Sequence, residues 1–290
     1  MVIFANEEGG VIGSRAMIGV LKPEGLELSN KSGFTVGQGI KRIGGDPDKL
    51  SSAVRTKGDL AAYVELHIEQ GAVLERNKMD IGVVEGIVGI EVWEVTVTGT
   101  ANHAGTTPMN MRQDALVAAS KVVIAINEVI RSTEGSHVGT VGRLELEPGA
   151  INIIPNRVRF TLELRDLSKD KVWTLFEKIE TQASAIAEET STEIEFSRLD
   201  MSNTPALADV RIQDAIVQSA TSLGYSYQKM PSGAGHDAQE IAQIAPIGMI
   251  FVPSVNGISH SPKEYSTPEH ITNGANVLLH TILNLDNLIN

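Results

Sequence analysis

Alternation of apolar and polar residues marks several strands of this chain. Positions 90–99 alternate strictly, which is typical of a strand with one buried and one solvated face. A similar alternation predicts a strand over 63–68. Continuous apolar runs over 2–5 and 247–252 instead predict buried strands of a parallel sheet.

A second pattern occupies the middle of the chain and predicts two helices among four strands. Its strands are predicted over 90–99, 138–146, 156–165 and 192–196, and its helices over 111–130 and 171–187. Ser168 is a favourable N-cap for the second of these helices. The order β-α-β-β-α-β is the ferredoxin-like arrangement, complete within about 110 residues, and we interpret it as an inserted domain.

The segments on either side of this insertion have α/β character. Helices are predicted over 14–18, 36–43, 210–223 and 269–285. The sequence therefore predicts an α/β protein in three segments. A catalytic domain is divided over 1–84 and 200–290, and the inserted domain occupies 85–199.

Composition narrows the class of protein. The 290 residues include no cysteine, which excludes a disulfide scaffold and a cysteine zinc finger. The formal charge of −12 argues against nucleic acid or an anionic membrane as a partner. No apolar run reaches the roughly 20 residues that span a bilayer, and residues 1–8 lack the features of a signal peptide. We expect a cytoplasmic protein.

Three polar clusters follow predicted parallel strands, at the sheet edge where open α/β folds place their ligands. They are Glu7-Glu8, His67 and His260. Two adjacent carboxylates after a buried strand suit a site in which one binds a metal ion and the other accepts a proton. Taken singly, the same residues are also explained by a solvated acidic loop, a packed core histidine and a structural loop histidine.

Two further loops carry histidines in unusual surroundings. His103 lies in Asn-His-Ala-Gly-Thr-Thr-Pro-Met, and His236 lies in Gly-Ala-Gly-His-Asp-Ala, where small residues allow close approach to a ligand. Asn152 and Arg165 flank the middle strands of the insertion. Arg165 is suited to clamping a carboxylate with two hydrogen bonds, although isolated residues of both types are also common on surfaces.

The order of these motifs is more specific than any one of them. Along the chain run Glu-Glu-Gly, His-Ile-Glu-Gln-Gly, Asn-His-Ala-Gly-Thr-Thr-Pro-Met, Gly-Ala-Gly-His-Asp-Ala and Ile-Ser-His-Ser-Pro. In this order the sequence resembles, over essentially its whole length, the N-carbamoyl-L-amino-acid hydrolase and allantoate amidohydrolase family. This family is related to the aminoacylase-type dinuclear metallopeptidases.

The resemblance implies a fold, a reaction and a set of site residues. The fold is a zinc-peptidase-like catalytic domain interrupted by a ferredoxin-like lid and dimerisation domain. The reaction is metal-dependent hydrolysis of a ureido C–N bond. The implied residues are Glu7 as general base; Glu8, His67 and His260 as metal ligands; and Gln70, His103, Asn152 and Arg165 as groups that bind substrate or stabilise the oxyanion.

Further implications concern His236, the metal and the partner. His236 lies in a family loop near the site and is a candidate for substrate binding. The ligand types suit zinc, manganese, cobalt or nickel, and we expect zinc or manganese. His103 is expected to act on the site of a partner subunit, which implies a homodimer formed through the inserted domain.

The family's pattern begins with a His-x-Asp motif and a bridging Asp, and neither precedes Glu7 here. We therefore expect an N-terminally truncated chain that binds one ion or none, instead of the family's two, and that is nearly inactive. The expected substrate is an N-carbamoyl-L-amino acid. Allantoate is the alternative, a general aminoacylase or dipeptidase is a more distant one, and an inactive dimerising fragment is the alternative of another class.

Overall fold

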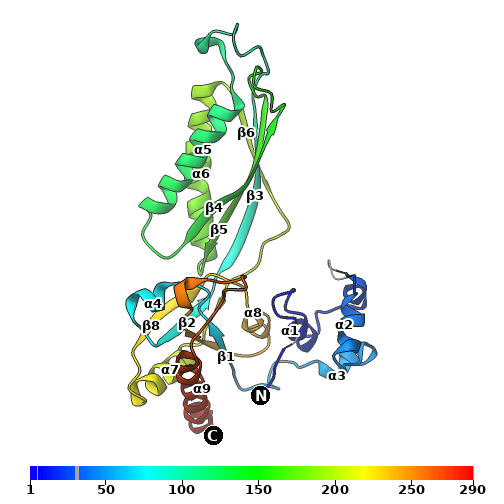
Figure 1. The fold of residues 1–290 in the computed structure, drawn as a ribbon, viewed down its shortest axis with the longest axis vertical. Helices are drawn as coiled ribbons and strands as arrows, with labels where there is room; N and C mark the ends of the chain where they lie inside the picture. Colours follow the sequence, from blue (N-terminus) through cyan, green and yellow to red (C-terminus); the bar gives the residue numbers. More distant parts are fainter. Residues whose placement is uncertain (5, 30–32, 290) are drawn as a thin grey trace. The chain divides into compact units, whose positions relative to one another are not determined.

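The computed structural model describes residues 1–4, 6–29 and 33–289 of the chain, which forms two compact units (Figure 1). The first unit comprises Met1–Ile87 and Ala206–Asn290, and the second comprises Val88–Pro205. The chain thus enters the second unit from the first and returns to it, as expected of an α/β protein with an inserted domain.

The first unit is built on a five-stranded mixed sheet. Its strands are β1 (Tyr63–Ile68), β2 (Ile81–Ile87), β7 (Ala206–Leu207), β8 (Tyr227–Ser232) and β9 (Ile247–Val252). The order is β1-β9-β2-β7, and β8 also pairs with β2. β1 runs parallel to β9, and β8 runs parallel to β2. The predicted bounds of β1 and β9 are confirmed, whereas β2 and β8 were not predicted.

Alternate side chains of β9 pack into two different hydrophobic cores. Ile250 and Val252 belong to one core, with residues of α7 (Val210–Ser222) and α9 (Pro268–Ile289). Met249 and Phe251 belong to the other core, with residues of α8 (Asp237–Ile241). Because successive side chains of a strand point to opposite faces, a fully apolar strand requires a layer on each side.

The remaining helices of the first unit are short. They are α1 (Ile12–Met17), α2 (Val36–Arg42), α3 (Leu50–Ala53) and α4 (Val73–Asn77), with 3-10 turns at Pro23–Glu27, Pro47–Lys49 and Val255–Gly257. Helices α1 and α8 are in contact: the Ser14 hydroxyl on α1 donates a hydrogen bond to Asp237 on α8.

A glycine on α9 allows this helix to pack closely on the sheet. A Cβ atom at Gly274 would lie 2.5 Å from Cγ1 of Val252 and 2.7 Å from Cδ1 of Leu66. We expect Gly274→Ala to lower the free energy of unfolding by about 1–3 kcal/mol through overpacking, measured by urea denaturation. Gly39→Ala on α2 is the matched control, because a Cβ there meets nothing within 4 Å. This control should raise stability by about 0.5–1 kcal/mol, and equal effects of the two substitutions would contradict the explanation.

The second unit has the predicted ferredoxin-like topology. Its elements, in chain order, are β3 (Gly89–Thr98), α5 (Ala115–Ser132), β4 (Val138–Glu147), β5 (Arg157–Asp166), α6 (Lys169–Thr190) and β6 (Glu193–Arg198), with a 3-10 turn at Met109–Met111. The four strands form an antiparallel sheet in the order β4-β5-β3-β6. The core between the sheet and its two helices contains Trp93, Phe160 and Phe176.

Both helices of the second unit begin at side-chain caps. Ser168 caps α6 as predicted, since its hydroxyl accepts from the backbone N–H of Lys171. The predicted start of α5 at Met111 is wrong. Asp114 accepts from the N–H groups of Leu116 and Val117, and the first turn therefore begins after it.

The strand predicted over 2–5 is wrong for the residues that the structure describes. Residues 1–4 are not in a strand, Val2 and Ile3 are 53% and 86% exposed, and Ala5 lies outside the described residues. A strand needs a neighbour for its backbone hydrogen bonds, and no described strand pairs with residues 1–4. Only Phe4 packs inward, with its ring centroid 6.2 Å from that of Tyr63.

No helix in the described part of the chain combines the length and apolar character needed to cross a membrane.

Candidate active site

The carboxyl ends of two parallel strands meet at one edge of the first unit's sheet. His67 is the penultimate residue of β1 and is paired in register with Phe251 of β9. The loop after β9 carries Ser254 and His260, and the backbone N–H of Gln70 donates to Oγ of Ser254 over 3.1 Å. The strand order therefore brings together two segments that are nearly 200 residues apart in the sequence.

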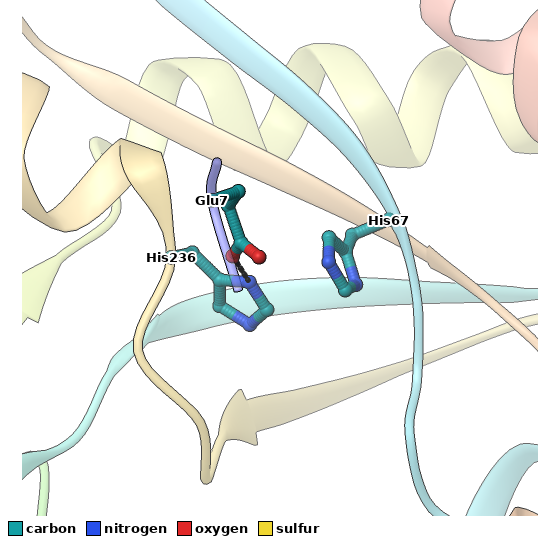
Figure 2. A group of neighbouring side chains, drawn as sticks. All are labelled: Glu7, His67 and His236. Carbon is teal, nitrogen blue, oxygen red and sulfur yellow. Dashed lines mark ion pairs between the residues drawn. The ribbon is translucent and has the colours of Figure 1, made fainter. Parts of the chain in front are cut away.

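Three side chains converge at this edge (Figure 2). One ligand atom each of Glu7, His67 and His236 lies within 4.8 Å of the other two. The imidazole rings of His67 and His236 meet edge to face with centroids 4.4 Å apart, and Oε1 of Glu7 lies 3.7 Å from Nδ1 of His236. They come from the loop before α1, from β1 and from the residue that precedes α8.

Hydrogen bonds determine which imidazole nitrogens are available for a ligand. Nδ1 of His67 lies 2.8 Å from the carbonyl oxygen of Ile68, so it carries the proton and leaves Nε2 as an acceptor. The Ser232 hydroxyl donates to the carbonyl of Ala234, and it therefore accepts from Nε2–H of His236 over 2.8 Å. Nδ1 of His236 is then a buried acceptor, and it has no hydrogen-bond partner among the described residues.

The electrostatics of the three residues suit a divalent cation. Positive charge beside Glu7 lowers its pKa against the opposing effect of burial: a protonated His236 donates from Nδ1 to the carboxylate, and His67 and His260 add to the effect. Burial lowers the pKa of His236, whose side chain is 1% exposed. A carboxylate and neutral imidazoles are the forms that bind metals such as Zn²⁺. Since the buried Nδ1 also lacks a donor, the group fits a metal ion.

Other predicted residues lie beside this group without joining it. Nε2 of His260 and Oε2 of Glu8 form an exposed ion pair at 3.1 Å, and Nε2 of Gln70 lies 3.4 Å from the same imidazole nitrogen. The structure thus brings Glu8, Gln70 and His260 together as an outer cluster. The metal-ligand roles of Glu8 and His260 stay predictions.

Sequence reasoning missed Glu65, which lies next to the group of three. Oε1 of Glu65 is 3.7 Å from Nδ1 of His236, and burial raises the pKa of Glu65 to about 7. The alternation along β1 could have indicated it, because Tyr63, Glu65 and His67 occupy every second position and so share one face of the strand. Asp237 is a second buried carboxyl whose pKa is raised by burial.

The other predicted site residues belong to the second unit, at two ends of its sheet. His103 forms a β-bridge with Ile153, and the N–H of Ala104 donates to the carbonyl of Asn152. These residues lie beyond the Thr98 end of β3, which is paired with the start of β5. Arg165 lies near the opposite end of β5, where Nε donates to Glu163 over 2.7 Å.

Similarity to known proteins identifies the family of this chain. The family described as "Peptidase family M20/M25/M40" matches residues 1–284. The chain belongs to this family. The M20 chain is 45% identical, over 98% of its own length and 70% of the relative's, to an N-carbamoyl-L-amino acid amidohydrolase of Geobacillus stearothermophilus. It is 34% identical to an allantoate amidohydrolase of Escherichia coli K12, over 96% of this chain and 68% of that one.

A solved structure agrees with this membership. An amidase of the hydantoinase/carbamoylase family from Burkholderia multivorans is 37% identical, with a TM-score of 0.85, and the match covers 97% of this M20 chain and 69% of that structure. The expected family, the α/β fold with a separate four-stranded antiparallel sheet, and membership of an amidohydrolase family are therefore confirmed.

Proposed function

We propose that this M20 protein hydrolyses the ureido C–N bond of N-carbamoyl-L-amino acids. The observation that carries the proposal is the convergence of Glu7, His67 and His236 in a chain that is 45% identical to an N-carbamoyl-L-amino acid amidohydrolase. Allantoate amidohydrolases are more distant, at 34–35% identity, which favours the carbamoyl substrate over allantoate.

The first unit supplies the metal site and the base. His67 and the neighbouring His236, with the predicted ligands Glu8 and His260, would hold one divalent ion, zinc or manganese. When bound, this ion supplies Lewis-acid activation of water and of the substrate carbonyl. Glu7 accepts the proton of the attacking water and passes it to the leaving nitrogen.

The second unit supplies a donor for the developing oxyanion. Nδ1 of His103 accepts hydrogen bonds from the backbone N–H groups of Gly105 and Thr106, at 3.0 and 3.2 Å. The neutral ring therefore carries its proton on Nε2, which is left to donate to an anionic oxygen. The exposed amide of Asn152 lies in the adjoining loop and contributes a further polar contact.

Arg165 binds the substrate carboxylate through its planar guanidinium. In one copy it cannot share a small substrate with His103, because β5 places eight residue steps, about 26 Å, between Arg165 and the end of the sheet that carries His103. We therefore propose a homodimer through the inserted domain, in which His103 of the partner subunit completes each site.

A comparison of substrates tests the function. The protein is supplied with Zn²⁺ or Mn²⁺ and offered an N-carbamoyl-L-amino acid, allantoate or an N-acetyl amino acid, and free amino acid or ammonia is measured. We expect the carbamoyl compound to be hydrolysed fastest, and no turnover after chelation of the metal. The near inactivity expected from the sequence stays a prediction, and the same assay tests it.

Each other outcome identifies an alternative. Faster release of ammonia from allantoate assigns the protein to allantoate hydrolysis, and faster cleavage of the N-acetyl compound assigns it to aminoacylases. A dimer on size-exclusion chromatography with no bound metal and no turnover overturns the proposed function and supports an inactive dimerising protein.

A further inference from the structure

Glu65 is a buried carboxyl residue that lies next to the candidate metal centre and outside the motifs quoted above. Its side chain is 11% exposed and lies on the same face of β1 as His67. Oε2 accepts two hydrogen bonds, from the Tyr63 hydroxyl at 3.0 Å and from the backbone N–H of Ala238 at 2.8 Å. These two donors hold the carboxylate in one orientation.

The other oxygen of this carboxylate is directed at the metal-binding group. Oε1 of Glu65 and Oε1 of Glu7 each lie 3.7 Å from Nδ1 of His236. Because Ser232 accepts the proton of Nε2, Nδ1 presents a lone pair. Two carboxylate oxygens and a lone pair that face one another form an arrangement that a bound cation stabilises by attraction. The geometry therefore includes Glu65 in the surroundings of the ion.

Glu65 also acts on His236 through the backbone. His236 is the N-cap of α8, and Ala238 is the second residue of that helix. The hydrogen bond from Ala238 to Glu65 joins the first turn of α8 to β1, which carries His67. Two elements of the metal centre that are distant in the sequence are thus held together by one side chain.

We propose that Glu65 is a positioning residue of the metal centre, which orients His236 toward the ion and adds a carboxylate oxygen beside it. This inference rests on the proposed metal-dependent function. Tyr63 is the second member of the arrangement, because its hydroxyl fixes the rotation of the Glu65 carboxylate.

Zinc binding by the full chain tests the proposal without reference to activity. Glu65→Gln retains an oxygen that can accept from Ala238 but removes the charge, and Tyr63→Phe removes one donor. We expect Glu65→Gln to weaken zinc binding by about 10–100-fold and Tyr63→Phe by about 2–10-fold, as for outer partners of metal ligands. The visible spectrum of bound Co²⁺ should change in Glu65→Gln.

Glu240→Gln is the matched control on α8. Among the described hydrogen bonds, the Glu240 carboxylate accepts only from Gln243, and this variant should bind zinc as the wild type does.

Zinc affinity within twofold of wild type for both Glu65→Gln and Tyr63→Phe, with an unchanged cobalt spectrum, overturns the proposal. If Glu65→Gln does not fold, Tyr63→Phe decides by the same two measurements. If the wild-type protein hydrolyses the carbamoyl substrate and the Glu65→Gln variant binds zinc normally, only this inference is overturned. If the Glu65→Gln variant binds zinc more weakly but the wild-type protein shows no turnover, the inference is supported and the proposed function is overturned.

Discussion

Replacing Glu7 by glutamine is expected to lower kcat for the N-carbamoyl-L-amino acid by about 10²–10⁴-fold, the usual contribution of a general base. Glu7 lies beside His67 and His236, and a glutamate carboxylate is ionised at neutral pH and can accept a proton. Glutamine has nearly the same shape but cannot take up a proton. Steady-state kinetics at saturating zinc measure the effect.

The neighbouring carboxylate provides the control for this substitution. Glu8 forms an exposed ion pair with His260, and as a metal ligand it should affect zinc affinity more than kcat at saturating zinc. We expect Glu8→Gln to bind zinc more weakly and to recover much of its kcat when zinc is added. A Glu7→Gln variant that keeps more than half of the wild-type kcat would show that another group moves the proton.

Removal of the Trp93 side chain is expected to destabilise the second unit by about 3–5 kcal/mol, the usual cost of truncating a buried aromatic residue to alanine. Trp93 is 2% exposed and is stacked on Phe176, with ring centroids 4.3 Å apart and an angle of 8° between the planes. Trp173 meets it edge to face at 5.7 Å. The Trp93→Ala substitution therefore leaves a large cavity between β3 and α6.

Urea denaturation measures this loss. We would follow it by circular dichroism and not by tryptophan fluorescence, because each substitution removes one of the two tryptophans. Trp173→Ala is the matched control: Trp173 is half-buried and packs on the outer side of the same cluster. We expect the control to cost clearly less than Trp93→Ala. Equal losses would mean that stacking on Phe176 does not distinguish the two positions.

Much of the fold is predictable from local patterns. β1 and β9 were predicted with their observed bounds, since alternation and a continuous apolar run each have one simple structural explanation. β8 was not predicted, because its sequence, Tyr-Gln-Lys-Met-Pro-Ser, has no apolar face. The run at 2–5 shows the opposite error: apolar residues alone do not make a strand when no neighbouring strand accepts their hydrogen bonds.

The candidate site was only partly predictable. The motifs identified Glu7 and His67, and both converge at the expected edge of the sheet. They did not indicate that His236 is the third member of that group, or that Glu65 faces it. Those relations depend on α8 packing beside β1 and on hydrogen bonds from Ser232 and Ala238, which no spacing in the sequence reports.

The sequence by itself determined the family, the ferredoxin-like order of the insertion and the chemical types at the site, because periodicity and motif order are properties of the chain. Only the tertiary structure decided which of those groups lie within reach of a common cation and which nitrogen of His67 and of His236 is left to bind it. The reason is physical: a metal ion requires ligand atoms within a few ångströms of one point. Such distances arise from strand pairing, helix packing and second hydrogen-bond partners, not from neighbours along the chain.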